Sequence, residues 1–84
     1  MITDPLSHEI LIYLEEHGST QSTNLINSMR HGNGLIYKRI REFEKIGLLS
    51  RTVSDDRSVY YSLTGLGISI TDKIREIDEL MEDV

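Results

Sequence analysis

The sequence predicts an α+β domain that is mostly α-helical, with three helices, a β-hairpin and a long C-terminal helix. Three observations predict this order. Apolar residues recur with a helical period up to Gly47, the period changes to two over residues 48–63, and a helical spacing returns after Thr64. Eighty-four residues make one domain whose core is small enough that association with a second chain would help it.

The first helix is predicted over residues 5–17. Asp4 and Pro5 form a helix start, because Asp accepts the unpaired N–H groups of a first turn and Pro fits the first helical position. Apolar residues then follow at the spacing of a core stripe, at Leu6, Ile10, Leu11 and Leu14, with Tyr13 beside them. Gly18 is the expected stop.

A second, shorter helix is predicted to begin at Ser22, after residues 19–21, which are either a connector or a brief strand. Its inward residues are Leu25, Ile26 and Met29. The helix ends before Gly32, which suits a tight turn, and Asn33 suits the N-cap of the next helix. A helix, a short turn and a helix make a helix-turn-helix, in which the second member is the recognition helix.

That second member is the stretch from Asn33 to Leu49, and it has two different faces. Helical geometry places Ile36, Ile40, Phe43 and Gly47 on the core side. The opposite side carries Lys38, Arg41 and Lys45, with Tyr37 at its margin. This side is either an ordinary solvated face or a surface that enters a nucleic-acid groove.

A β-hairpin is predicted directly behind this helix. Residues 48–53 and 59–63 alternate in the manner of strands, and the second run is rich in β-formers. Residues 54–58 contain Asp55 and Asp56, whose side chains favour a turn. The tip of the hairpin therefore carries Arg57, for which a salt bridge with either Asp is the alternative to a role in binding.

The last helix is predicted over about 65–82, with Thr64 as its cap. One apolar seam runs along it at near-heptad spacing, through Leu66, Ile70, Ile74, Ile77, Met81 and Val84. The seam can pair with a second copy of the chain, pack on the first helix of its own chain, or do both in part. We expect pairing, so residues 1–64 are predicted as the binding domain and 65–84 as a dimerisation element.

The charge is divided into three blocks. Residues 1–29 carry −4, residues 30–57 carry +3 and residues 58–84 carry −4, which gives the net charge of −5. Seven of the nine Lys and Arg residues lie in the middle block, so a basic surface is expected to be local and flanked by acidic ends.

Several classes of function are excluded by composition. The absence of cysteine excludes disulfides and thiolate metal sites. His8, His17 and His31 lie far apart, and no catalytic motif is present, so neither a metal, nor a cofactor, nor a small-molecule ligand, nor an enzymatic activity is expected. No segment approaches the ~20 apolar residues of a membrane span, and we expect a soluble, cytoplasmic protein.

Part of the chain resembles a known family. The run IREFEKIGLL at 40–49, Arg51 and the run DDRSVYYSLT at 55–64 are similar to the winged helix-turn-helix transcription regulators of prokaryotes, the MarR, ArsR, PadR and HxlR-like groups. The resemblance covers about residues 5–70 and does not resolve the subgroup. It implies a winged helix in which the third helix enters the major groove of DNA, the wing reaches backbone or minor groove, and the terminal helix helps to dimerise.

Carried over by position, the resemblance assigns groove-facing roles to Asn33, Leu35, Tyr37, Lys38 and Arg41. Lys38 and Arg41 are the expected base readers, since a rigidly held Arg can bond guanine through two N–H groups. Arg30 and Lys45 are expected to contact phosphate, Arg51 the backbone, and Arg57 the minor groove. The chain has Gly34-Leu35 where many relatives open this helix with Ser and Thr.

The sequence therefore predicts a sequence-specific transcription regulator that binds double-stranded DNA as a homodimer. The alternative is a winged-helix module that binds proteins and not DNA. The net charge of −5 and the two missing hydroxyl groups favour this alternative.

Overall fold

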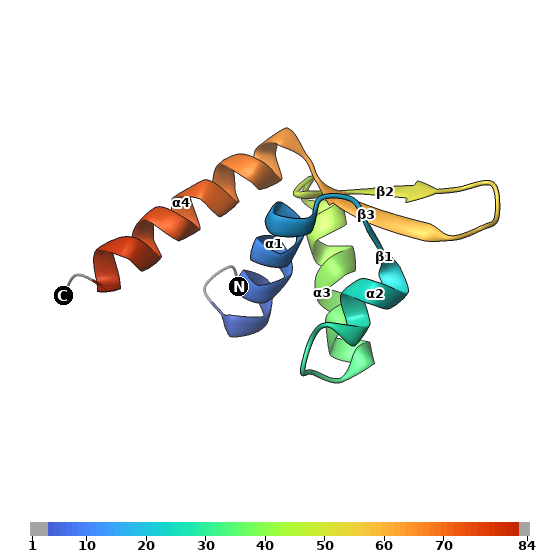
Figure 1. Ribbon diagram of the computed structural model, residues 1–84, viewed down its shortest axis with the longest axis horizontal. Helices are drawn as coiled ribbons and strands as arrows, with labels where there is room; N and C mark the ends of the chain where they lie inside the picture. The colour runs from blue at the N-terminus through green and yellow to red at the C-terminus, as the bar shows by residue number, and fades with distance from the viewer. Residues whose placement is uncertain (1–3, 83–84) are drawn as a thin grey trace.

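The computed structural model describes residues 4–82, which form four helices and a small antiparallel sheet (Figure 1). In chain order the elements are α1 (Pro5–His17), β1 (Thr20–Gln21), α2 (Ser22–Asn27), α3 (Asn33–Lys45), β2 (Leu49–Val53), β3 (Val59–Leu63) and α4 (Gly65–Glu82). This order confirms the predicted fold class, a mostly α-helical α+β winged helix-turn-helix.

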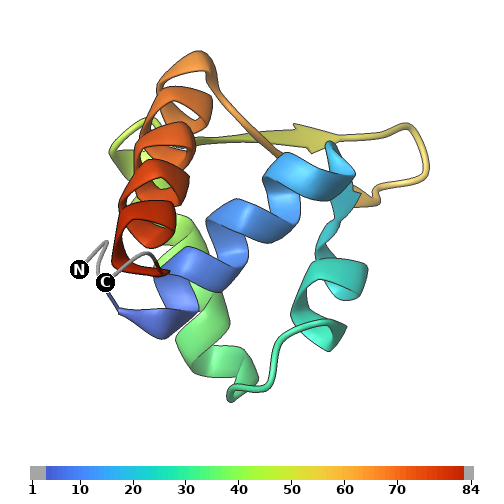
Figure 2. The ribbon, with the colours of Figure 1, turned by 60° about the vertical axis from the view of Figure 1, so that its left-hand side comes forward.

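The sheet has the strand order β1-β3-β2. Residues 20–21 are a brief strand, because Thr20 pairs with Tyr61 in the middle of β3. The hairpin itself is in the register Leu49 with Leu63 and Val53 with Val59, so its two strands match over their whole length. It projects away from the helices as a wing in both ribbon views (Figures 1 and 2).

The core lies between α1, α2, α3 and the base of the sheet. The stripe predicted on α1 is buried, and so are the inward residues of α3, Ile36, Ile40 and Phe43. Gly47 departs from the prediction, because α3 ends at Lys45 and Gly47 is an exposed turn residue with a φ of 87°. This left-handed conformation suits glycine and allows the chain to reverse into β2.

The N-terminal caps of the first three helices differ from the prediction. Helix α1 begins at Pro5 as expected, but the side chain of Asp4 caps no N–H group of the helix. The cap positions of α2 and α3 are Gln21 and Gly32, so Ser22 and Asn33 are the first residues of their helices. Thr64 does cap α4, since its Oγ1 accepts a hydrogen bond of 3.0 Å from the N–H of Gly67.

Asp4 is drawn away from the cap by Arg39, 35 residues further along the chain. Its Oδ1 accepts hydrogen bonds from the Ser7 hydroxyl at 2.5 Å and from Arg39 Nη1 at 2.6 Å. Arg39 Nη1 also lies 2.5 Å from Ser7 Oγ and therefore joins α3 to the start of α1. The Asp4 carboxylate forms a stronger hydrogen bond with a charged guanidinium than with a neutral backbone N–H group. This difference explains why the side chain bonds Arg39 and does not cap the helix.

This cluster predicts a pH dependence of stability. The Ser7 hydroxyl and then the Arg39 guanidinium lower the pKa of Asp4 below its ordinary value of 3.8. A carboxyl group whose pKa is lower in the folded state than in the unfolded state stabilises the fold at pH values above its ordinary pKa. This stabilisation is lost as the pH falls through the lowered pKa of the folded state. Asp4→Asn should therefore reduce the free energy of unfolding by about 1 kcal/mol at pH 7. Urea titrations should show this difference shrinking below pH 3.8; a difference that stays constant to pH 2 would contradict the assignment.

Helix α4 runs beside α1 (Figure 2) and is held to the domain along one of its faces. Gly67, Thr71 and Ile74 are its buried residues. Arg75 pairs with Glu15 of α1, and its Nη2 lies 3.8 Å from Glu16 Oε2. Ile74, predicted as part of a seam for a second copy, is therefore used inside the chain, because α4 is rotated to bring this residue onto the core.

Candidate nucleic-acid interface

A groove of about 420 Å³ lies between the recognition helix α3, the first residue of α2 and the wing. Its walls come from four elements, α2, α3, β2 and β3. They are formed by Ser22, Tyr37, Arg41, Glu44, Arg51, Val59 and Tyr61. The sheet register explains part of this arrangement, because Arg51 on β2 is directly opposite Tyr61 on β3.

Three of the residues predicted to bind DNA meet in this groove, namely Tyr37, Arg41 and Arg51. Arg41 and Arg51 are exposed and Tyr37 is half-buried. Within residues 4–82, neither Arg41, Arg51 nor Lys38 forms an ion pair. Their charges are therefore not neutralised by the chain's own carboxylates.

The other predicted residues lie around the groove or apart from it. Asn33 and Leu35 are exposed in the first turn of α3, Lys38 is exposed on the same helix and Lys45 is exposed at its end. Arg30 lines a separate cavity of about 300 Å³ beside α1, so the structure does not bring it into the groove. Arg57 is exposed at the tip of the wing.

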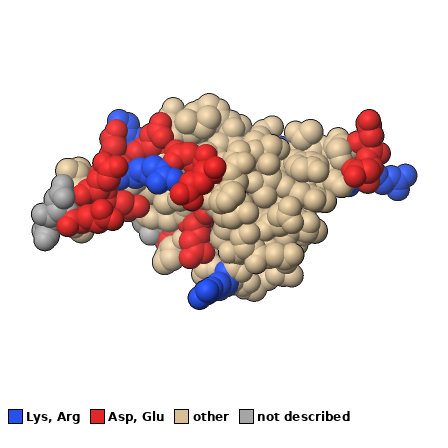
Figure 3. Space-filling view, in the orientation of Figure 1, with Lys and Arg blue, Asp and Glu red and all other residues tan. Residues whose placement is uncertain are grey.

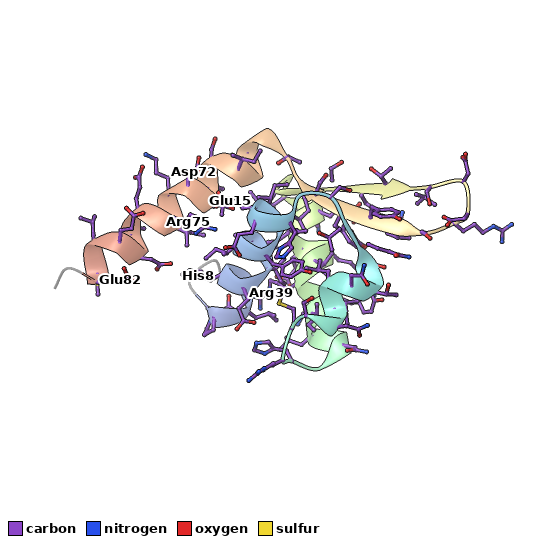
Figure 4. All side chains as sticks on the ribbon, in the orientation of Figure 1. His8, Glu15, Arg39, Asp72, Arg75 and Glu82 are labelled. Carbon is purple, nitrogen blue, oxygen red and sulfur yellow. The ribbon has the colours of Figure 1, made fainter. Side chains whose placement is uncertain are left out.

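Arg39, unlike the other basic residues of α3, forms contacts inside the protein. It is mostly covered and bonds Asp4 and Ser7, and its Nε lies 3.7 Å from Glu42 Oε2. Figure 4 shows Arg39 among the helices rather than on the wing side. The basic residues of α3 thus divide into Arg39, which holds the fold, and Lys38, Arg41 and Lys45, which remain at the surface.

Ser22 and Glu44 line the groove but were not predicted as site residues. Ser22 was expected as a helix cap; it is instead the first residue of α2, half-buried, and lines the same groove as Arg41. Glu44 lies three residues after Arg41, which is the helical spacing of neighbours, and this was the available signal. Its carboxylate opposes phosphate and can accept a hydrogen bond from cytosine.

The wing turn is closed by backbone bonds around Arg57. The N–H of Arg57 bonds Ser54 O at 2.9 Å, and the N–H of Ser54 bonds Ser58 O at 2.9 Å. Asp56 accepts hydrogen bonds from the Ser54 hydroxyl and from the Ser58 N–H, which lower its pKa. In the described part of the chain Arg57 forms no salt bridge with either Asp of the turn, and it has a φ of 69°, a conformation that favours glycine.

Arg57→Gly should separate stability from binding. Glycine adopts the left-handed conformation without strain, so the wing should become more stable by roughly 0.5–1 kcal/mol. The same change removes the cation at the wing tip and should weaken DNA binding. Thermal unfolding and a gel shift on the same variant check the two halves of this prediction. A variant that is less stable and binds DNA as tightly as the parent would contradict both.

The predicted seam on α4 is largely uncovered. Leu66, Ile77 and Met81 are 52%, 59% and 68% exposed, and Ile70 is half-buried against the core. Leu80, which was not predicted, is 67% exposed and lies three residues beyond Ile77. Val84 lies outside the described residues.

Glu44 apart, the largest acidic cluster lies away from the groove. Besides a smaller acidic patch at the tip of the wing, where Asp55 and Asp56 lie, the face in Figure 3 carries Asp and Glu over α4 and the adjoining end of α1. Figure 4 shows Glu15, Asp72 and Arg75 close together in this region. No helix within residues 4–82 is both long enough and apolar enough to cross a lipid bilayer.

No protein-family model matches the chain, and no curated protein matches it. Solved structures do match. A candidate transcriptional regulator from Salmonella typhimurium, ytfH, is 25% identical with a TM-score of 0.82, and the match covers 96% of this chain and 74% of that one. A candidate regulator of the MarR family from Enterococcus faecalis V583 is 22% identical with a TM-score of 0.88, covering 98% of this chain and 76% of the other.

MepR, a transcription regulator of the Staphylococcus aureus multidrug efflux pump MepA, is 21% identical with a TM-score of 0.86. The match covers 94% of this chain but only 60% of MepR, so the chain spans about three fifths of that protein. The neighbours are transcription regulators built on the same order of helices and wing. The chain thus has the winged helix-turn-helix fold, and MarR-family transcription regulators are among its structural neighbours.

Proposed function

We propose that this protein is a sequence-specific transcription regulator that binds double-stranded DNA as a homodimer in the cytoplasm of a prokaryotic cell. The observation that supports this best is the groove between α3 and the wing. It holds Arg41 and Arg51, which have no ion-pair partner within residues 4–82, beside the aromatic ring of Tyr37. Helix α3 would enter the major groove, and the wing would contact backbone or minor groove.

Each surface residue has a role in this proposal. Lys38 and Arg41 read base edges, and Asn33, Leu35 and Tyr37 contact the groove wall from the same helix. Arg30, Lys45 and Arg51 contact phosphate, and Arg57 contacts the minor groove. Phosphate contacts supply affinity, whereas the base contacts supply discrimination.

The homodimer is proposed to form through α4. Its exposed apolar residues are Leu66, Ile77, Leu80 and Met81, with Ile70 at their edge. A second copy would cover them and would place two recognition helices about one turn of DNA apart, on a pseudo-palindromic site. Sedimentation of the intact chain against a truncation after Ile74 tests this part, since only the intact chain should be dimeric.

A second candidate function is a winged-helix module that binds a protein. The net charge of −5 and the position of Glu44 in the groove favour it, because both oppose a polyanion. A module of this kind would not bind random duplex DNA at low salt.

A gel shift on random duplex DNA decides between the two. Three phosphate contacts per protomer, about six per dimer, predict a slope of roughly −5 for log K against log salt. Weak binding at 50 mM salt that is lost by 200 mM salt would support the regulator. No binding at low salt would remove it.

A further inference from the structure

We infer that Leu35 contacts the methyl group of a thymine in the major groove, so that each half-site of the bound DNA contains a thymine opposite the first turn of α3. This inference rests on the DNA binding in the proposed function and adds a base that the protein recognises. It is carried by the exposure of Leu35, by its place in α3 and by the bare backbone of Gly34 beside it.

Leu35 is a large apolar side chain that lies outside the hydrophobic core. It is 47% exposed, whereas its neighbour Ile36 is completely buried. Two other large apolar residues in the described chain before α4 are exposed, Ile46 and Val53. Ile46 is the C-cap of α3 and Val53 is the last residue of β2, so neither belongs to the first turn of α3. Leu35 is therefore the apolar group that this turn presents to solvent.

The first turn of α3 is the part of the helix that is placed to reach base edges. In helix-turn-helix proteins, the N-terminal residues of the recognition helix contact the bases. Helix α3 begins at Asn33, so Leu35 is its third residue. Lys38 follows three residues later and is exposed, and residues at this spacing are neighbours on a helix surface. A helix docked so that Lys38 reads a base therefore brings Leu35 against the edge of a neighbouring base pair.

The chemistry of leucine selects one base among the four. Its side chain neither donates nor accepts a hydrogen bond, so any polar atom that it covers loses water without gaining a partner, which is unfavourable. In the major groove, guanine, adenine and cytosine present hydrogen-bond donors or acceptors, whereas thymine also presents its C5 methyl group. This methyl group is the apolar feature of the groove that Leu35 can cover without taking water from a polar atom.

Gly34 supplies a second observation, because it leaves the helix bare next to Leu35. It lies four residues before Lys38 and seven before Arg41, and it therefore shares their outward face. A Cβ at Gly34 would meet nothing within 4 Å, so packing inside the protein does not require glycine here. Leucine is shorter than lysine or arginine and reaches a base only where the helix lies deep in the groove. A glycine on the outward face allows that close approach.

Replacement of thymine by deoxyuridine tests the contact, because it removes the methyl group and keeps the base pair. Binding sites are first selected from a random duplex library with the intact protein, and each recurring thymine is then replaced singly. At one position in each half-site, the change should weaken binding about fourfold, the effect of exposing one buried methyl-sized group to water. The same change in both half-sites should weaken binding about 15-fold. Fluorescence anisotropy measures both losses.

Leu35→Ala identifies the protein side of the contact. The variant lacks the atoms that cover the methyl group, so it should bind the thymine and deoxyuridine sites equally. Ile46→Ala is the matched control, since Ile46 is 46% exposed but lies at the other end of α3. This control should keep the fourfold preference for thymine. Both truncated side chains are exposed, so both variants should fold, and thermal unfolding checks this.

The outcomes separate the inference from the proposed function. Equal binding of thymine and deoxyuridine sites by the parent protein would overturn the methyl contact, while DNA binding itself is measured by the gel shift. A preference for thymine that persists in Leu35→Ala, or that is lost equally in Ile46→Ala, would overturn the role of Leu35. No binding to any duplex at low salt would overturn the proposed function and the inference with it.

Discussion

Replacing Lys38 and Arg41 together by alanine is expected to remove sequence-specific DNA binding and to leave the fold intact. Both side chains are exposed on α3, and neither has an ion-pair partner within residues 4–82. Each base contact is worth about 1–3 kcal/mol, so the loss of two contacts should lower the affinity for a selected site at least about 30-fold. Fluorescence anisotropy on that site measures the loss, and thermal unfolding checks the fold.

Arg41→Lys is the matched variant that distinguishes base reading from phosphate contact. Lysine keeps the charge but cannot form the paired N–H contacts of a guanidinium. If Arg41 reads a base, the variant should lose discrimination among sites and keep its affinity for random duplex. Tight, unchanged binding by the double alanine variant would show that α3 does not enter the groove as proposed.

Gly67→Ala is expected to destabilise the protein strongly. A Cβ at this position would overlap the backbone oxygen of Leu48 and would lie 3.2 Å from Leu63 Cδ2. A backbone atom cannot move aside as a flexible side chain can, so α4 would have to shift away from the hairpin. We expect a loss of about 3 kcal/mol in the free energy of unfolding, at the upper end of overpacked positions. Urea denaturation measures it.

Gly65→Ala and Gly34→Ala are the controls. Both glycines lie in the first turn of a helix, and a Cβ would meet nothing within 4 Å at either position. Since alanine favours helix more than glycine, each change should be neutral or stabilising by up to about 1 kcal/mol. Equal destabilisation by all three alanines would show that the contact with Leu48 is not the cause.

Local signals in the sequence were sufficient to predict where the helices and the wing lie. Pro5 and Gly18 mark the two ends of α1, and Thr64 marks the start of α4, because each acts within one turn of the chain. The alternation over 48–63 likewise gave both strands of the hairpin. The apolar stripes on α1 and α3 were buried as predicted, since their spacing alone fixes the face that turns inward.

Contacts between residues that are far apart in the sequence could not be predicted from these local signals. The carboxylate of Asp4 left its cap position for Arg39, and Ile74 turned onto the core because Gly67 lets α4 approach Leu48. Glu44 is a groove residue only because α2 and β3 are placed beside α3. The roles of the surface residues in DNA binding and dimer formation stay predictions.

Two contacts of different kinds fix the angle of α4, and they respond differently to salt. At one end, the backbone of Leu48 accepts the N–H of Thr64 at 3.0 Å and lies against Gly67. Near the middle of the helix, the half-buried ion pair of Arg75 with Glu15 is partly open to screening by counterions. Salt should therefore loosen the outer end of α4 but not its root. Because Ile77, Leu80 and Met81 of the proposed dimer surface lie in this outer part, the half-site spacing that a dimer tolerates would then widen as the ionic strength rises.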